Sequence, residues 1–121
     1  WLLPLLFILA CQQQSRLLQS TVKHPAWSVN KAVYELNIRQ FSQAGNLKAV
    51  QRRLPAIKEL GAGIIWLMPI YPIGEKNRKG TLGSYYSVKD YRKVNPEFGT
   101  MQDLKDLVAQ AHRIGLYVIL D

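Results

Sequence analysis

The chain has 121 residues, 48% of them apolar and 20% charged, which excludes a disordered polypeptide and is typical of one globular domain. Its formal net charge is +8. The basic side chains are spread over expected helix faces apart from one run at residues 76–79, which favours a solvated surface and argues against binding of nucleic acid or another polyanion. The chain starts at Trp1 and stops at Asp121 directly after an apolar run, so we expect a truncated part of a longer protein.

Residues 1–10 are apolar and uncharged, and Cys11 and a polar stretch follow. Ten apolar residues are too few to span a bilayer but fit the hydrophobic region of a signal peptide. Ala10 before the lone Cys11 resembles the lipobox of bacterial lipoproteins, whose cysteine is lipidated after cleavage. We therefore expect residues 1–11 to be a signal peptide, with export and attachment to the cell-envelope membrane through a lipid on Cys11. Secretion without lipidation is the alternative. Residues 12–29 are expected to be a polar tether.

The first strand, helix and second strand are expected between residues 33 and 68. Residues 33–38 alternate like a strand, with Glu35 and Asn37 on one face. Residues 46–60 carry apolar side chains at steps of three and four, which predicts a helix ended by Gly61. Pro55 inside it is expected to kink it or split it into two short turns. Residues 64–68 form an apolar run that Pro69 limits, typical of a parallel strand covered on both faces.

A long irregular stretch to Gly99 follows, and stretches of that length are uncommon in compact domains unless they are functional. Thr100 and Asp103 predict the capped start of a second helix, which Gly115 ends before a third buried strand at residues 116–120. This order predicts an α/β fold with a parallel sheet built by right-handed crossovers. Periodicity alone does not distinguish an open doubly wound sheet from an eight-stranded barrel. Polar Glu35 and Asn37 on the inner face of the first strand favour a barrel centre.

The segment at residues 83–100 carries a specific pattern. Tyr86, Asp90, Asn95-Pro96 and Gly99-Thr100 resemble the segment after the second strand in the alpha-amylase superfamily of glycoside hydrolases, of the family 13 type. Residues 34–41, 60–69 and 115–121 resemble further family segments in the same order. The resemblance implies that residues 30–121 are the first three strands and two helices of a truncated (β/α)8 TIM barrel, the N-terminal part of a catalytic domain.

The resemblance also implies an activity and roles for residues. The intact enzyme would cleave alpha-glucosidic bonds in starch or maltooligosaccharides by a retaining mechanism with two carboxylates. Tyr86 matches an aromatic residue that stacks on the sugar next to the scissile bond. Asp90, which holds the loop together, and Asp121, at the end of the third strand, match residues that support the active site. Tyr85 stands where the family often has proline.

None of the eight acidic residues matches a reacting carboxylate, because the family carries these after strands four, five and seven. Glu35 is interpreted as a hydrogen-bonded carboxylate of the barrel centre. We therefore expect the isolated chain to be inactive, and to be unstable or to aggregate because its sheet edges are open and its barrel interior is uncovered. No cofactor is visible and calcium is conceivable only for the full-length enzyme. His24 and His112 lack metal-ligand spacing, so no metal ligand is predicted.

Two other functions fit parts of the pattern. A non-catalytic glucan-binding or accessory member of the same superfamily would share every feature visible in these residues. Carboxylates after strands four, five and seven of the complete gene would distinguish the enzyme from it. A nucleotide- or phosphate-binding α/β domain would need a glycine-rich turn after the first strand, where residues 39–43 read Arg-Gln-Phe-Ser-Gln.

Overall fold

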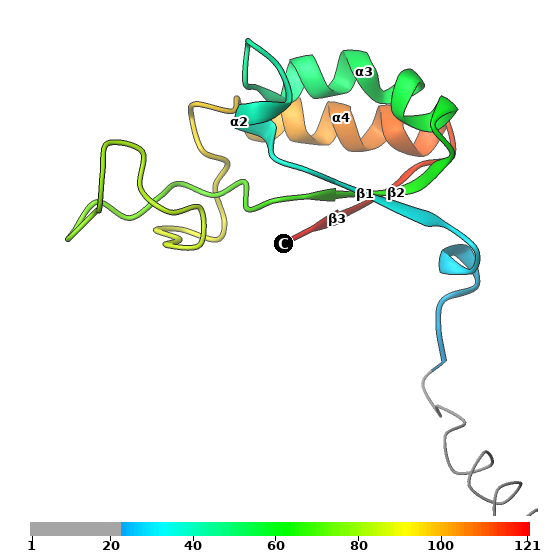
Figure 1. Ribbon diagram of the computed structural model, residues 1–121, viewed down its shortest axis with the longest axis horizontal. Helices are drawn as coiled ribbons and strands as arrows, with labels where there is room; N and C mark the ends of the chain where they lie inside the picture. Colours follow the sequence, from blue (N-terminus) through cyan, green and yellow to red (C-terminus); the bar gives the residue numbers. More distant parts are fainter. Residues whose placement is uncertain (1–22) are drawn as a thin grey trace, which may run out of the picture.

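The computed structural model describes residues 23–121. The expected signal peptide and Cys11 lie outside the described residues. The described elements, in chain order, are η1 (Ala26–Ser28), β1 (Ala32–Leu36), α2 (Ile38–Phe41), α3 (Leu47–Glu59), β2 (Ala62–Leu67), α4 (Met101–Arg113) and β3 (Tyr117–Leu120) (Figure 1). Strand, helix, strand, long loop, helix and strand therefore follow one another as the sequence predicts. The short helices η1 and α2 were not predicted.

The three strands form one parallel sheet in the order β1-β2-β3. In this register Leu36 of β1 pairs with Leu67 of β2, and Leu67 pairs with Leu120 of β3. The carboxyl ends of all three strands consequently meet at one edge. The sequence prediction of a parallel α/β sheet is confirmed.

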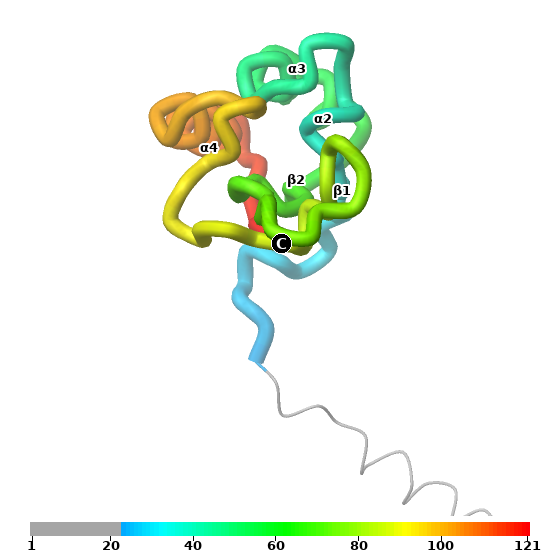
Figure 2. The backbone as a smooth tube through the Cα atoms, turned by 90° about the vertical axis from the view of Figure 1, so that its left-hand side faces the viewer, coloured from blue at the N-terminus to red at the C-terminus, as the bar shows by residue number. Residues whose placement is uncertain are grey.

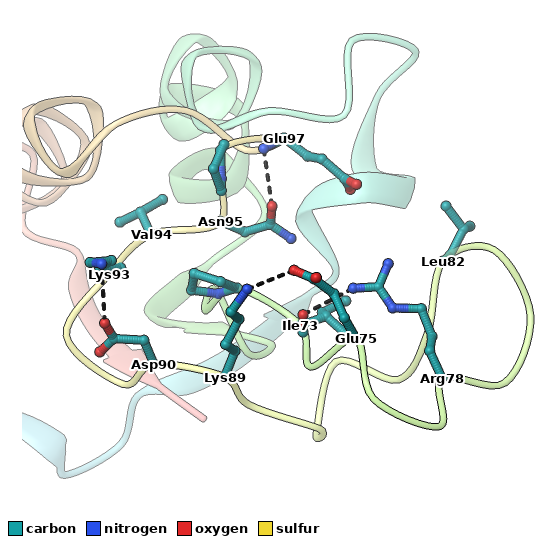
Figure 3. Close-up of a pocket in the computed structure, with 12 residues that line it drawn as sticks. Ile73, Glu75, Arg78, Leu82, Lys89, Asp90, Lys93, Val94, Asn95 and Glu97 are labelled. Carbon is teal, nitrogen blue, oxygen red and sulfur yellow. Dashed lines mark hydrogen bonds and ion pairs between the residues drawn. The ribbon is translucent and has the colours of Figure 1, made fainter.

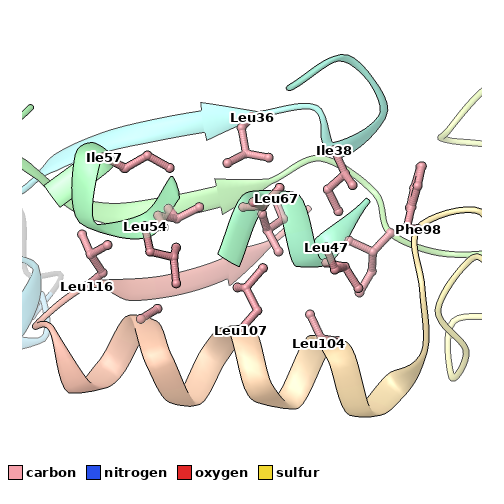
Figure 4. Packing of buried hydrophobic residues seen from close by; sticks show 14 of the residues in the cluster. Leu36, Ile38, Leu47, Leu54, Ile57, Leu67, Phe98, Leu104, Leu107 and Leu116 are labelled. Atoms are coloured by element: carbon pink, nitrogen blue, oxygen red, sulfur yellow. The ribbon is translucent and has the colours of Figure 1, made fainter. Parts of the chain in front are cut away.

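Helices α3 and α4 lie against one face of this sheet and against each other (Figures 1 and 2). Leucine and isoleucine side chains from both helices and from the strands fill the space between these layers (Figure 4). Leu54, Leu67 and Leu107 are fully buried there. Burying one such side chain stabilises the fold by about 1.5–3 kcal/mol, so this core holds the strands in register.

The ends of the two long helices are fixed by polar caps and by glycines. The side chain of Asn46 accepts the N–H of Ala49 at 3.0 Å, and Thr100 with Asp103 forms the expected capping box of α4. Gly61 and Gly115 follow the helices with φ of 90° and 72°, a region that glycine enters without steric cost.

Pro55 does not divide α3, so the predicted split into two short turns is wrong. The helix runs from Leu47 to Glu59 as one element with Pro55 inside it. Pro55 is exposed, so the carbonyl of Gln51, which loses its N–H donor, lies on the solvent side of the helix. Buried Leu54 and Ile57 anchor the turn on the opposite side.

The first strand ends two residues before its predicted end. Asn37 caps the short helix α2, because its Oδ1 accepts the N–H of Arg39 at 3.1 Å. An asparagine side chain competes with the strand ladder for backbone N–H groups, which turns the chain after Leu36. Asn37 therefore follows β1, and the prediction that the first strand includes Asn37 is wrong.

The second face of the sheet is not covered by α3 or α4. The alternation places Val33, Glu35, Trp66, Tyr117 and Ile119 on it. Val33 is 53% exposed and Ile119 37% exposed. At its amino-terminal end the indole of Trp27, from η1, stacks on the ring of Tyr117 with centroids 4.4 Å apart. Glu35 is exposed on this face.

Among residues 23–121, no helix combines the length and the apolar character needed to cross a membrane.

Candidate functional site

The loop between β2 and α4, residues 68–100, extends from the edge where the carboxyl ends of the strands meet (Figure 1). It folds on itself through an isolated antiparallel bridge between Ile73 and Val88, beside which the N–H of Gly74 donates to Ser87 O at 2.7 Å. The loop returns to the end of β2 where the N–H of buried Asn95 donates to the carbonyl of Ile70 at 2.8 Å. These backbone contacts give this long loop a defined shape.

Tyr86 and Asp121 meet at this edge. The Tyr86 hydroxyl donates to Asp121 Oδ2 at 2.9 Å, and the N–H of Asp121 donates to the carbonyl of Leu67 at 3.0 Å. Asp121 thus extends the pairing of β3 with β2 by one residue. The hydrogen bond to Asp121 raises the pKa of Tyr86, with smaller contributions from burial and from the charges of Asp121 and Glu35.

The ring of Tyr86 is 61% exposed, although the hydroxyl is held in place. The side chain of Ser84 accepts the N–H of Tyr86 at 3.3 Å. This arrangement offers a flat aromatic face to a ligand at the end of the sheet where α/β barrels carry their active sites.

Asp90 lies further along the loop and bonds within it. Its Oδ1 accepts the N–H of Arg92 at 2.9 Å, the geometry of an Asx turn. That hydrogen bond holds the pKa of Asp90 below its ordinary value, and the charges of Arg92 and Lys93 lower the pKa further. Asp90 does not bond to Tyr86 or Asp121, so any support it gives the pair passes through the loop.

Sequence reasoning missed one cluster beside Tyr86. The guanidinium of Arg39 donates to the hydroxyl of Tyr85 at 3.2 Å and to Glu97 Oε2 at 2.6 Å. It also lies over the rings of Tyr85 and Phe98, at 4.8 Å and 5.7 Å from their centroids. Arg39 and Tyr85 are 46 positions apart, and no local pattern connects them. The one signal in the sequence was Tyr85 itself, at a position where the resembling family often has proline.

A groove of about 560 Å³ lies elsewhere on the same loop (Figure 3). Charged side chains line it in pairs of opposite sign, with Lys89 Nζ at 2.6 Å from Glu75 Oε1 and Lys93 Nζ at 3.5 Å from Asp90 Oδ2. Neither Tyr86 nor Asp121 lines this groove. The edge of the sheet, and not this groove, is the better candidate site because it contains the ordered Tyr86–Asp121 pair. Within residues 23–121, no three His, Cys, Asp or Glu side chains gather as a metal site would require.

Comparison with known proteins decides the family. The sequence model described as the alpha amylase catalytic domain matches residues 17–121. The chain belongs to this family. An alpha-amylase from Lactobacillus plantarum has a similar crystal structure, with a TM-score of 0.75 and 53% identity over 76% of this chain and 22% of that one. The alpha-amylase of Geobacillus thermoleovorans, solved with acarbose, has a TM-score of 0.64 and 34% identity over 75% of this chain and 22% of that one.

Alpha-amylase 2 of Dictyoglomus thermophilum is 33% identical over 112 residues, which are 80% of this chain and 19% of that protein. The chain therefore spans about a fifth of the length of such relatives. Within the alpha-amylase family its strands β1 to β3 and their helices match the start of the (β/α)8 barrel. This match confirms the barrel over the open doubly wound sheet, and it makes the carboxyl edge with Tyr86 and Asp121 the edge on which barrel enzymes build their sites.

Proposed function

We propose that the complete protein hydrolyses alpha-glucosidic bonds in starch or maltooligosaccharides, and that Tyr86 and Asp121 form part of its sugar site. Membership of the alpha-amylase catalytic-domain family supports this proposal. The names of the relatives support it as well, since they include alpha-amylases, alpha-glucosidases and oligo-1,6-glucosidases. A solved relative was crystallised with acarbose and another with maltotriose.

The observation that carries the proposal is the 2.9 Å hydrogen bond between Tyr86 and Asp121 at the carboxyl edge of the sheet. A sugar ring has a C–H face that packs on an aromatic ring, and Tyr86 presents an exposed ring of that kind. The Tyr86 hydroxyl donates this hydrogen bond to Asp121, and the bond fixes the orientation of the Tyr86 ring. Asp90 shapes the loop that carries Tyr86.

The proposed reaction retains the anomeric configuration. A carboxylate attacks the anomeric carbon and forms a glycosyl-enzyme, while a carboxylic acid protonates the leaving oxygen. The ionised acid then takes a proton from water, which attacks the anomeric carbon and releases the carboxylate. Both groups are expected in the part of the enzyme that follows this chain. Residues 30–121 would bind and orient the sugar next to the scissile bond through Tyr86, and they would perform no covalent step.

The test is hydrolysis of starch and of maltotetraose by the purified full-length protein, followed by NMR of the first anomer released. We expect reducing sugar with the alpha configuration, and a beta product would contradict retention. Binding of maltooligosaccharide without any hydrolysis would instead identify the non-catalytic accessory protein.

We further propose that the protein is exported and attached to the cell envelope through a lipid on Cys11. The support is the apolar run of residues 1–10, which ends with the small residue Ala10 directly before Cys11. The full-length protein, expressed in a bacterium with radioactive palmitate, should become labelled and sediment with membranes. The Cys11→Ser variant should lose the label. Release of an unlabelled wild-type protein into the medium would favour simple secretion.

A further inference from the structure

We propose that Arg39 and Tyr85 are positioning residues that hold Tyr86 in its sugar-binding orientation. This inference rests on the proposed function, because it assumes that Tyr86 contacts the sugar. It concerns how the chain fixes an exposed aromatic ring on a long loop.

Arg39 is itself firmly held. The backbone N–H of Arg39 donates to Asn37 Oδ1 at the start of α2. Arg39 therefore lies directly after the carboxyl end of β1. Its side chain is only 19% exposed, and the ring of fully buried Phe98 lies beneath the guanidinium. A guanidinium fixed in this way presents its N–H groups in set directions.

The two ends of the guanidinium bind two distant points of the β2–α4 loop. One N–H donates to the Tyr85 hydroxyl at 3.2 Å and another donates to Glu97 at 2.6 Å. The ring of Tyr85 also lies against the guanidinium and packs on the core cluster. Arg39 therefore joins the middle of the loop to its end, next to the start of α4.

Tyr86 depends on this anchor because it has little packing of its own. Its ring is 61% exposed, and its side chain is held at the hydroxyl by Asp121. The orientation of the ring follows from the backbone of residues 84–86, and in that stretch Tyr85 is the residue bound to the core. Loss of the Tyr85 anchor should let the loop move and break the alignment of Tyr86 with Asp121.

The test uses the full-length enzyme and a double-mutant cycle on kcat/KM for a maltooligosaccharide. Tyr85→Phe keeps the ring over Arg39 and removes the hydroxyl, so kcat/KM should fall by about fivefold, the size expected for loss of one ordinary hydrogen bond. Arg39→Met should give a larger loss. In the Tyr86→Ala background the Tyr85→Phe effect should shrink to less than about twofold, because the residue it positions is gone.

Glu75→Gln is the matched control, since it removes another 2.6 Å ion pair of the same loop without touching Tyr85. It should leave kcat/KM unchanged, and melting temperatures and circular dichroism spectra should show that all variants are folded. If Tyr85→Phe leaves kcat/KM unchanged, or acts equally with and without Tyr86, the positioning role is overturned while the sugar contact stands. If Tyr86→Ala itself changes nothing, the proposed sugar contact fails and this inference fails with it.

Discussion

The Tyr86 hydroxyl donates a 2.9 Å hydrogen bond to Asp121 Oδ2, which lies 35 positions later in the sequence. This bond connects the exposed loop between β2 and α4 to the end of β3. Asp121 is in turn paired with Leu67 through its backbone N–H at 3.0 Å. The loop thereby gains a fixed point on the sheet. The ring that the family resemblance assigns to the sugar is positioned by a residue of the barrel itself.

Tyr86→Ala should lower kcat/KM for maltooligosaccharides by roughly 10- to 100-fold in the full-length enzyme, because ring contact and orientation are both lost. The melting temperature should hardly change, since the ring is 61% exposed. Steady-state kinetics beside thermal unfolding checks both parts. Tyr86→Phe keeps the ring and should lose less activity than Tyr86→Ala. Equal kinetics for wild type and Tyr86→Ala would remove Tyr86 from the sugar site.

The titration of Tyr86 should depend on Asp121. The hydrogen bond to Asp121 raises the pKa of Tyr86 above its ordinary value of 10.0. The raised pKa means that folding favours the protonated form of Tyr86. The contribution of this hydrogen bond to folding stability is therefore complete below pH 10.0, and it is lost as the pH rises through the higher pKa of the folded state. Asp121→Asn should lower the pKa of Tyr86. Tyrosinate absorbance is measured against pH for the wild type and for Asp121→Asn. Subtracting the curve of the same protein with Tyr86→Phe added isolates the titration of Tyr86. An unchanged Tyr86 pKa in Asp121→Asn would contradict the contact.

The sequence predicts the elements that depend on local patterns. Strand β1 follows from its alternating pattern, and β2 and β3 follow from short apolar runs. Helix α4 follows from its capping pair Thr100 and Asp103. Two local predictions failed for physical reasons. Asn37 bonds a backbone N–H and ends β1 early, and Pro55 stays within α3 because its side of the helix is exposed.

The site was only partly predictable. The resemblance singled out Tyr86 and Asp121 separately, but their hydrogen bond depends on how a loop of over thirty residues folds back to the sheet. The bond between Arg39 and Tyr85 depends on the same path. The spacing of apolar residues along the sequence cannot predict these two contacts. Each contact involves a tyrosine side chain of the long loop, where no helix or strand repeat is present.

Leu107→Ala should destabilise the folded protein by about 2–5 kcal/mol, because the side chain is fully buried between α4 and the sheet and its removal leaves a cavity. Denaturant unfolding of the full-length protein measures the change. Leu60→Ala removes the same atoms at a position that is 74% exposed, and should cost far less. Similar losses for both variants would contradict the core described for α3 and α4.

Thr100→Ala should destabilise the start of α4 by about 1 kcal/mol at neutral pH. The Thr100 hydroxyl donates to Asp103 Oδ2 at 2.7 Å and accepts the N–H of Asp103 at 3.1 Å. The hydroxyl and N–H of Thr100 hold the pKa of Asp103 below its ordinary 3.8. Their stabilisation is therefore present above that pH and is lost as the pH falls through the lower folded pKa. The difference between wild type and Thr100→Ala in thermal melts should shrink in acid, and a constant difference would contradict the capping box.

A polypeptide of residues 23–121 expressed alone should self-associate and hydrolyse no starch. Its sheet has two edge strands, β1 and β3, and one face on which Val33 and Ile119 are 53% and 37% exposed. Unpaired edges and exposed apolar side chains favour association between copies. Ile119→Lys should reduce association measured by light scattering, because it puts a charge on that face. The matched variant Leu60→Lys, at the end of α3, should not. A monomeric wild-type polypeptide would show that this face is stable in water, and starch hydrolysis by it would place reacting groups within these residues.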